Sequence, residues 1–211
     1  MSEKSHQMDN NTIYETIITT YNEDQTVNAA VMGISLTLSG EWVIKPFRGT
    51  DTQKNIQRNN ECVVNFTLNP EIFVLCALFQ EELTDDLFLS SPHVHAPILK
   101  ECIKDHEALK VVSIDEKTDP LKVIYYCRQV YSMDVTDKPE IFTRAFSSLI
   151  EILIHTTRIL AFKNQPEKAE EIKQLKELIK HHSNIITKVT QNDSYYRKLL
   201  DKVINKIESE E

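Results

Sequence analysis

The stretch WVIKPFRGTDTQKNIQRNNECVVNFT, residues 42–67, decides how the first part of the chain folds. It opens with a short apolar run, which is typical of a strand. Thr50 or Asp51 is a suitable N-cap, and the polar residues 52–59 predict a short helix. The continuously apolar segment after the helix, 62–68, predicts a buried strand. We therefore expect a short polar helix between two strands of one sheet.

Further strand patterns, rich in β-branched and aromatic residues, lie on both sides of this stretch. We expect these strands over residues 13–21, 27–38, 41–45, 108–114 and 121–135, the last being long enough to bend or to carry a bulge. Short turns between strands favour an antiparallel barrel over a parallel sheet. Pro70 opens a predicted helix that runs to residue 82. Residues 83–98 lack periodicity and hold two prolines, which predicts a loop or lid.

The composition changes near residues 137–139, and the pattern is helical from there on. We expect three helices: the first over 139–163, the second from Pro166 to near His181-His182, and the third over about 193–208. The sequence thus predicts an α+β chain with three parts, namely a disordered tail (1–12), a barrel domain (13–136) and a C-terminal helical domain (137–211).

Composition excludes several functions. The chain has 24 Lys and Arg against 32 Asp and Glu, a net charge of −8, which argues against nucleic acid as a partner. Three glycines cannot build a Rossmann or Walker phosphate loop. No apolar run approaches the roughly 20 residues of a membrane span, and the first twelve residues show no signal peptide. We therefore expect a cytoplasmic protein that does not bind membranes.

Cysteine and histidine patterns indicate no metal site. The four cysteines are widely spaced without a C-x-x-C pair, and we interpret the three that lie among apolar residues as buried free thiols. His93 and His95 form an H-x-H pair in a proline-bounded loop that offers no third ligand nearby. His181 and His182 are expected to suit the dipole at a helix end.

Two stretches could bind a ligand. Arg48, followed by Gly49 and the hydroxyls of Thr50 and Thr52 at a helix start, could hold a phosphate group through charge, hydroxyls and helix N–H groups. The alternative is a plain N-cap before a solvated helix. Residues 19–35, in which Asn28 lies among small residues, leave room for a flat ligand beside the backbone, although an ordinary hairpin would look the same.

The order of these motifs resembles the archaeal DUF447 family. The pattern is T-x-N-x-x-x-x-x-N-A-A-x-M-G, then R-G-T-x-T-x-x-N-I, N-x-x-C-V-V-N-F-T and P-x-x-F. That family is similar to the FMN-binding split β-barrels, the fold of many flavin reductases. The stretch from Arg144 to Arg158 also looks like the family's helical domain. The family often has Pro before Met-Gly, whereas this chain has Val31.

The resemblance implies a split β-barrel that forms a homodimer, with FMN near the subunit interface. Arg48, Thr50 and Thr52 would hold the phosphate with Asn65 nearby, and residues 28–33 would lie beside the isoalloxazine ring. The cofactor residues implied in this way are Thr20, Asn28, Ala30, Met32, Gly33, Arg48, Gly49, Thr50, Thr52 and Asn65.

A polar stripe on the first C-terminal helix has two interpretations. It comprises Arg144, Ser148, Glu151, His155 and Arg158, at helical spacing. One interpretation is a solvent-facing row of local ion pairs. The other is a pocket over the flavin, in which His155 is the candidate catalytic residue that moves protons.

The leading functional hypothesis is an FMN-dependent oxidoreductase of the flavin reductase type, with a small-molecule electron donor or acceptor that the sequence does not identify. One alternative is a non-enzymatic FMN carrier or sensor whose C-terminal helices engage a partner. The other is a structural dimer that has lost its flavin.

Overall fold

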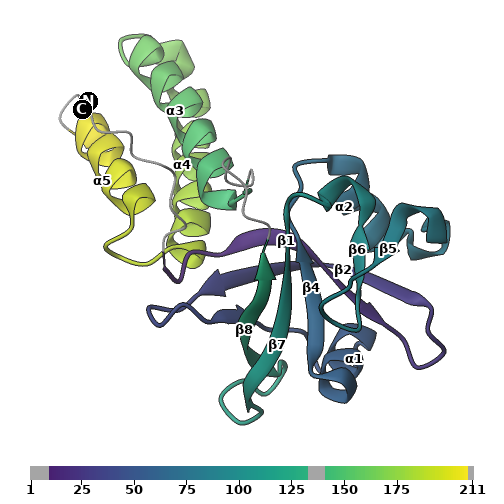
Figure 1. The fold of residues 1–211 in the computed structure, drawn as a ribbon. Coiled ribbons are helices and arrows are strands. Elements are labelled where there is room, and N and C mark those ends of the chain that lie inside the picture. Colours follow the sequence, from purple (N-terminus) through teal and green to yellow (C-terminus); the bar gives the residue numbers. More distant parts are fainter. Residues whose placement is uncertain (1–9, 133–140, 209–211) are drawn as a thin grey trace. The chain divides into compact units, whose positions relative to one another are not determined.

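The computed structural model describes residues 10–132 and 141–208 (Figure 1). Contacts divide the chain into two compact units, Tyr14–Phe142 and a second unit of Thr143–Glu211 with the segment up to Ile13. The predicted boundary at 136/137 and most of the predicted tail lie outside the described residues. Thr12, the last residue of that tail, is fully buried.

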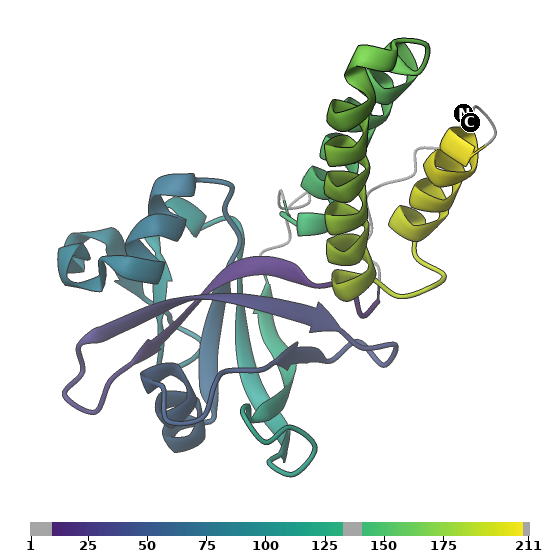
Figure 2. The same cartoon turned by 180° about the vertical axis from the view of Figure 1, so that it is seen from behind.

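The first unit is a closed antiparallel barrel (Figures 1 and 2). Its strands, in spatial order β1-β2-β3-β8-β7-β4, are β1 (Tyr14–Tyr21), β2 (Val27–Leu36), β3 (Trp42–Ile44), β8 (Ile124–Ser132), β7 (His106–Asp115) and β4 (Glu61–Asn65). The predicted antiparallel barrel is therefore confirmed. The predicted bulge is present as well, because the β7–β8 register shifts by one residue at two places.

Contacts between strands that are not neighbours identify the interior of the barrel. Trp42 on β3 donates its indole N–H to Glu107 on β7, at 2.5 Å, and its ring lies 6.1 Å from that of Phe66. The thiols of Cys62 on β4 and Cys127 on β8 also meet there, and this contact together with burial raises the pKa of Cys62. All four cysteines are buried and free, which confirms the prediction for three of them and extends it to the fourth.

Helix α1 (Asp51–Asn59) packs against one end of the barrel, just before β4. Its Ile56 is fully buried. The Gln53 side chain lies 3.3 Å from the hydroxyl of Tyr125, which is fully buried on β8. Because α1 precedes β4 and α2 (Pro70–Leu78) follows it, the two helices lie at opposite ends of this strand (Figure 1).

The segment 83–98, predicted as a loop or lid, is a packed hairpin. Its strands β5 (Phe88–Ser90) and β6 (Pro97–Leu99) pair antiparallel, with a 3₁₀ turn at Asp85–Leu87 just before β5 and another at Lys100–Cys102 just after β6. The prediction was wrong because the two prolines obscured the alternation of buried Val94, Ala96 and Ile98. These three pack with Val63 and Ala108 on the outer face of the barrel. The helix that Pro70 opens ends at Leu78, with a 3₁₀ turn at Gln80–Glu82.

The second unit contains three helices, α3 (Arg144–Phe162), α4 (Ala169–Val189) and α5 (Tyr195–Glu208). Helix α3 begins later than predicted because Thr143 caps it, accepting a hydrogen bond from Ala145 N at 3.3 Å. Helix α4 follows a 3₁₀ turn at Pro166–Lys168 and runs past His182, contrary to prediction, because buried Ile186 and Val189 continue its apolar face.

Helix α3 is also long and apolar enough to cross a membrane, judged by length and composition, with a mean hydropathy of 1.4 over its most apolar window. The sequence led us to expect no apolar run near the length of a membrane span, and α3 shows that this expectation was too strict. A core helix passes the same test. Here Leu149, Ile152 and Ile159 of α3 pack with Ile179 of α4 and Leu200 of α5. A cytoplasmic location stays a prediction.

Glu107 makes the stability of the barrel depend on pH. Burial raises the pKa of this carboxyl group to about 7, although the Trp42 indole opposes the shift. Since the folded pKa lies above the unfolded value of about 4.5, the folded state binds the extra proton between these values. The free energy of unfolding should therefore fall as pH rises from about 4.5 to 7, by up to about 3 kcal/mol from this group.

Glu107→Gln should remove this part of the pH dependence. Urea unfolding followed by the fluorescence of Trp42, the chain's single tryptophan, measures the barrel itself. The exposed hairpin variant Glu23→Gln is the control and should keep the wild-type slope. Parallel wild-type and Glu107→Gln profiles over this pH range would contradict the assignment.

Candidate functional site

The barrel is split along one edge of β2. This strand pairs with β1 from Val27 to Ile34, but with β3 only from Ile34 to Leu36. The chain after β3 instead follows the start of β8, since Arg48 N donates to Leu121 O at 3.0 Å. Within residues 10–132 and 141–208, no strand pairs with the β3 side of β2 between Val27 and Gly33.

The ladder alternation shows which backbone groups face this open edge. Asn22 N donates to Thr26 O at 2.9 Å, which makes Asn28, Ala30 and Met32 the residues that bond to β1. Val31 therefore directs its N–H and C=O groups away from β1, towards the split. Residues 30–33, which include Ala30, Met32 and Gly33 of the predicted site, are half-buried.

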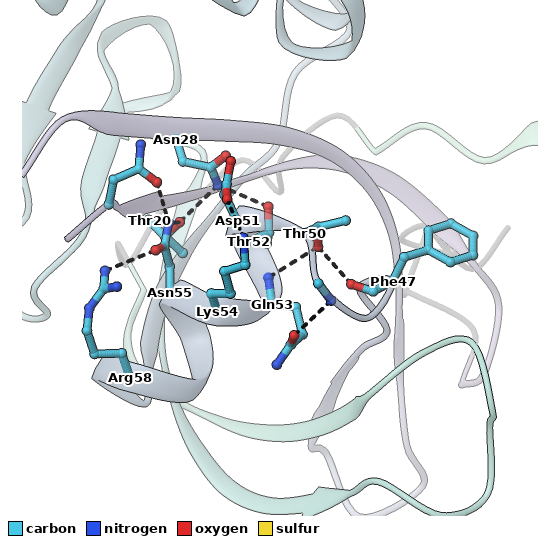
Figure 3. A network of polar contacts seen from close by, with 12 residues as sticks. Thr20, Asn28, Phe47, Thr50, Asp51, Thr52, Gln53, Lys54, Asn55 and Arg58 are labelled. Atoms are coloured by element: carbon cyan, nitrogen blue, oxygen red, sulfur yellow. Dashed lines mark hydrogen bonds and ion pairs between the residues drawn. The ribbon is translucent and has the colours of Figure 1, made fainter. Parts of the chain in front are cut away.

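Helix α1 begins beside this edge and is capped as predicted. Thr50 Oγ1 accepts a hydrogen bond from Gln53 N at 3.4 Å and donates one to Phe47 O at 2.8 Å (Figure 3). Gly49, at φ +79°, supplies the left-handed turn before the cap, and its N–H is bound by the Gln53 side chain at 3.1 Å. The N–H groups at the start of a helix have no intrahelical acceptor.

Arg48 is exposed, and its guanidinium group does not point to the start of α1. It donates instead to the carbonyl oxygens of Glu116 and Asp119, in the turn between β7 and β8. Asp51, the first residue of α1, pairs with Lys54 at 3.2 Å in an exposed position. The three predicted phosphate-binding side chains, those of Arg48, Thr50 and Thr52, are therefore close in sequence but do not meet at one point in the structure.

A buried amide network joins β1, β2 and α1 (Figure 3). Asn28 Nδ2 donates to Thr20 Oγ1 and to Thr52 Oγ1, each at 3.0 Å. Asn55 Nδ2 donates to the same Thr20 oxygen at 3.0 Å and to Asn22 Oδ1 at 2.8 Å. The network brings together three predicted site residues, Thr20, Asn28 and Thr52, and uses their polar groups within the protein.

Sequence reasoning gave no role to Asn55 and Arg58. Arg58 Nη2 donates to Asn55 Oδ1 at 2.9 Å and to Tyr21 O at 2.8 Å, which ties the last turn of α1 to β1. The signal was available for Asn55, because it is the Asn of the R-G-T-x-T-x-x-N-I pattern. Arg58 carries no such signal, because a lone arginine on a polar helix is usually a solvated residue.

Asn65 is fully buried on the other face of the sheet from the amide network. Its Nδ2 donates to Ile17 O at 3.1 Å and to Thr19 Oγ1 at 3.0 Å, while its Oδ1 accepts from Leu99 N at 2.9 Å. Thr19 and Thr20 are neighbours on β1, so their side chains point to opposite faces of the sheet. Asn65 bonds to Thr19 on one face, whereas the amide network bonds to Thr20 on the other. Asn65 anchors the β5–β6 hairpin, which the sequence did not predict.

The polar stripe of α3 fits neither interpretation completely. Ser148 and His155 are buried, so a wholly solvent-facing row is wrong for these two. Glu151, Arg144 and Arg158 are exposed. His155 belongs to the helical unit, whereas the proposed flavin residues belong to the barrel unit. Its role as a catalytic residue therefore stays a prediction.

Comparisons with known structures agree with this architecture. An FMN-bound DUF447 protein from Methanosarcina mazei has a TM-score of 0.51 at 21% identity, covering 93% of this chain and 95% of that one. A flavoredoxin from Methanosarcina acetivorans has a TM-score of 0.51 at 17% identity, covering 68% and 86%. An NADH:FAD oxidoreductase from Streptomyces globisporus has a TM-score of 0.50 at 11% identity, covering 68% and 90%.

The fold is therefore that of the flavin reductase-like split barrels, followed by a helical unit. Family models resolve the class further. Residues 14–133 match the DUF447 N-terminal domain, and residues 143–208 match the second DUF447 model, each described as a protein of unknown function. The chain belongs to the DUF447 family.

The Thr20 hydroxyl should be important for barrel stability. Thr20→Val keeps the shape of the side chain but leaves one N–H of Asn28 and one of Asn55 without an acceptor. We expect the free energy of unfolding to fall by about 1–3 kcal/mol. Urea unfolding of the flavin-free protein, monitored by Trp42 fluorescence, measures this.

Ser113→Ala, which removes an exposed hydroxyl from β7, is the control and should cost less than about 0.5 kcal/mol. Equal losses in the two variants would show that the buried network contributes nothing specific.

Proposed function

We propose that this protein binds FMN at the split of the barrel, between the open edge of β2 and the start of α1. The observation that carries the proposal is the half-paired β2, whose exposed edge lies directly beside a capped helix N-terminus. Asn28 of β2 and Thr52 of α1 are in hydrogen-bond contact, at 3.0 Å, so the two features adjoin. The FMN bound by the Methanosarcina mazei family member supports the choice of cofactor.

The open edge suits the flat ring of a flavin. Around Val31, the backbone N–H and C=O groups have no strand partner on the split side, so they can bond to the polar edge of an isoalloxazine. The small side chains of Ala30 and Gly33 let a ring approach the backbone closely. Proline at the Val31 position, frequent in the family, is compatible with this geometry because the Val31 N–H has no ladder acceptor.

The start of α1 suits a phosphate group. Its positive dipole end and its N–H groups favour an anion, and the exposed Thr50 hydroxyl would donate to the phosphate on leaving Phe47 O, its acceptor in this structure. Arg48 would complete this site by leaving the carbonyl oxygens of Glu116 and Asp119, which are weaker partners than a phosphate. Thr52 and Asn65, already bonded within the protein, would position the site without contacting the phosphate.

We also propose that the site is completed by a second copy of the chain. Two surface hollows of the described residues, of about 410 and 670 Å³, are lined by residues of α2 and by residues of α4 and α5. None of the ten predicted cofactor residues lines either hollow. Residues 30–33 are only half-buried in the single chain, so a second copy would supply the further surface that covers a flavin at the split.

A bound flavin would supply hydride and electron transfer, and this chain would hold and orient it. We favour a flavin reductase-type oxidoreductase acting with a small-molecule donor or acceptor. A flavin carrier or sensor is the second candidate, favoured by the additional helical unit. Bleaching of the FMN-loaded protein by NADH or NADPH distinguishes them, because a carrier would stay oxidised in this assay.

Arg48→Ala should weaken FMN binding at least tenfold, because it removes the cation that would pair with the phosphate. Riboflavin, which lacks the phosphate, should bind the variant and the wild type alike. Quenching of flavin fluorescence during titration of the flavin-free protein measures both affinities.

Arg128→Ala is the control, since it removes an exposed arginine of β8 that belongs neither to the amide network nor to the predicted site, and it should change FMN affinity less than twofold. The phosphate assignment fails if Arg48→Ala leaves FMN affinity unchanged, or if it weakens riboflavin binding to the same extent. Native mass spectrometry of the untreated protein tests the dimer and the cofactor together, and a flavin-free monomer would contradict both.

A further inference from the structure

Three potential metal ligands, none of them used by the proposed flavin site, meet between two helices of the second unit. Glu151 and His155 lie one turn apart on α3, and His182 lies on α4. One ligand atom of each residue lies within 4.8 Å of the ligand atoms of the other two. Helical bundles build metal sites in this way, from side chains on facing helices.

The imidazole of His155 gives an independent indication of a missing partner. The residue is 8% exposed, and its Nδ1 atom has no hydrogen-bond partner in the described part of the chain. Its Nε2 atom lies 3.9 Å from Glu151 Oε2, beyond hydrogen-bond distance. The Nε2 atom, which faces Glu151, would be the metal ligand, and an ion there would give this buried ring one bonded nitrogen, while Nδ1 would stay without a partner among the described residues.

The spacing fits a small divalent ion after a modest movement. Zn²⁺ lies about 2.0–2.2 Å from histidine nitrogen and carboxylate oxygen, so tetrahedral ligand atoms are roughly 3.4 Å apart. The Glu151–His155 separation of 3.9 Å is close to this value. The Glu151 side chain is 48% exposed and can turn to close the difference. Ser148, 3.5 Å from His182 Nδ1, is the nearest hydroxyl to that ring.

We propose that Glu151, His155 and His182 bind one divalent transition-metal ion of the Zn²⁺ class, with water in the fourth position. Two imidazoles and one carboxylate suit Zn²⁺ or Co²⁺, whereas Mg²⁺ and Ca²⁺ prefer oxygen ligands. The bound ion links α3 to α4 and so stabilises the helical unit. The site is independent of the flavin proposal.

The full-length protein, treated with a chelator, provides the test. Calorimetric titration with ZnCl₂ should show one ion per chain, and CoCl₂ should give the visible absorption of a four-coordinate site. Glu151→Gln and His182→Gln should each weaken Zn²⁺ binding at least tenfold. His181→Gln removes an adjacent exposed histidine outside the cluster and should bind within twofold of the wild type.

Folding controls keep the result interpretable. Glu151 is half-exposed, so Glu151→Gln should keep the far-ultraviolet circular dichroism of the metal-free wild type. Zn²⁺ should raise the thermal midpoint of the wild type more than that of Glu151→Gln, because an ion that binds the folded state stabilises it. Zn²⁺ binding that survives both Glu151→Gln and His182→Gln, or that is lost in a His93→Gln/His95→Gln variant, would overturn the proposal.

Discussion

The barrel depends on an unequal division of hydrogen bonds along β2. All eight residues of β1 pair with this strand, whereas β3 pairs with only its last three residues. The chain closes into a barrel, but one edge of β2 stays open around Val31. An open edge with unpaired backbone groups is a liability in a stable protein unless something covers it. The proposed flavin site and the proposed dimer contact both use this edge.

The short helix α1 connects that edge to the barrel core. Its cap at Thr50 fixes where the helix begins, and the amides of Asn28 and Asn55 fix how the helix sits on β1 and β2. Every side-chain N–H of Asn28 and Asn55 has an acceptor. A buried network that is fully bonded in this way specifies one position of α1 on the two strands. The start of α1 is therefore held in place beside the split, with the Gln53 N–H bonded to the Thr50 hydroxyl as its cap.

Much of this architecture could be predicted from the sequence. The cap at Thr50, the strand order along the chain and the two-part organisation follow from local patterns that the structure repeats. The hairpin over 88–99 was not predicted, because its two prolines obscure the local alternation and because long-range hydrogen bonds, from the Thr19 hydroxyl to Pro97 O and from Leu99 N to Asn65, hold it on the barrel. Such long-range contacts cannot be read from the local sequence.

Side-chain direction was harder to predict than secondary structure. Arg48 and Thr52 were grouped by their spacing and Asn65 by the family resemblance, yet these side chains lie at a turn, in a buried network and on the opposite sheet face. The pairing of His155 with His182 was equally hidden, because only the packing of α3 on α4 brings them together. Sequence order fixes neighbours along the chain, and the fold decides which of them meet.

Amide hydrogen exchange at Val31 tests the central claim most directly, namely that the open edge of β2 receives the flavin ring. In the flavin-free protein the Val31 amide should exchange faster than those of Ala30 and Met32, which bond to β1. Saturating FMN should slow Val31 exchange by tenfold or more and leave its two neighbours nearly unchanged. Unchanged exchange at Val31, with protection appearing on another surface of the barrel, would contradict the account.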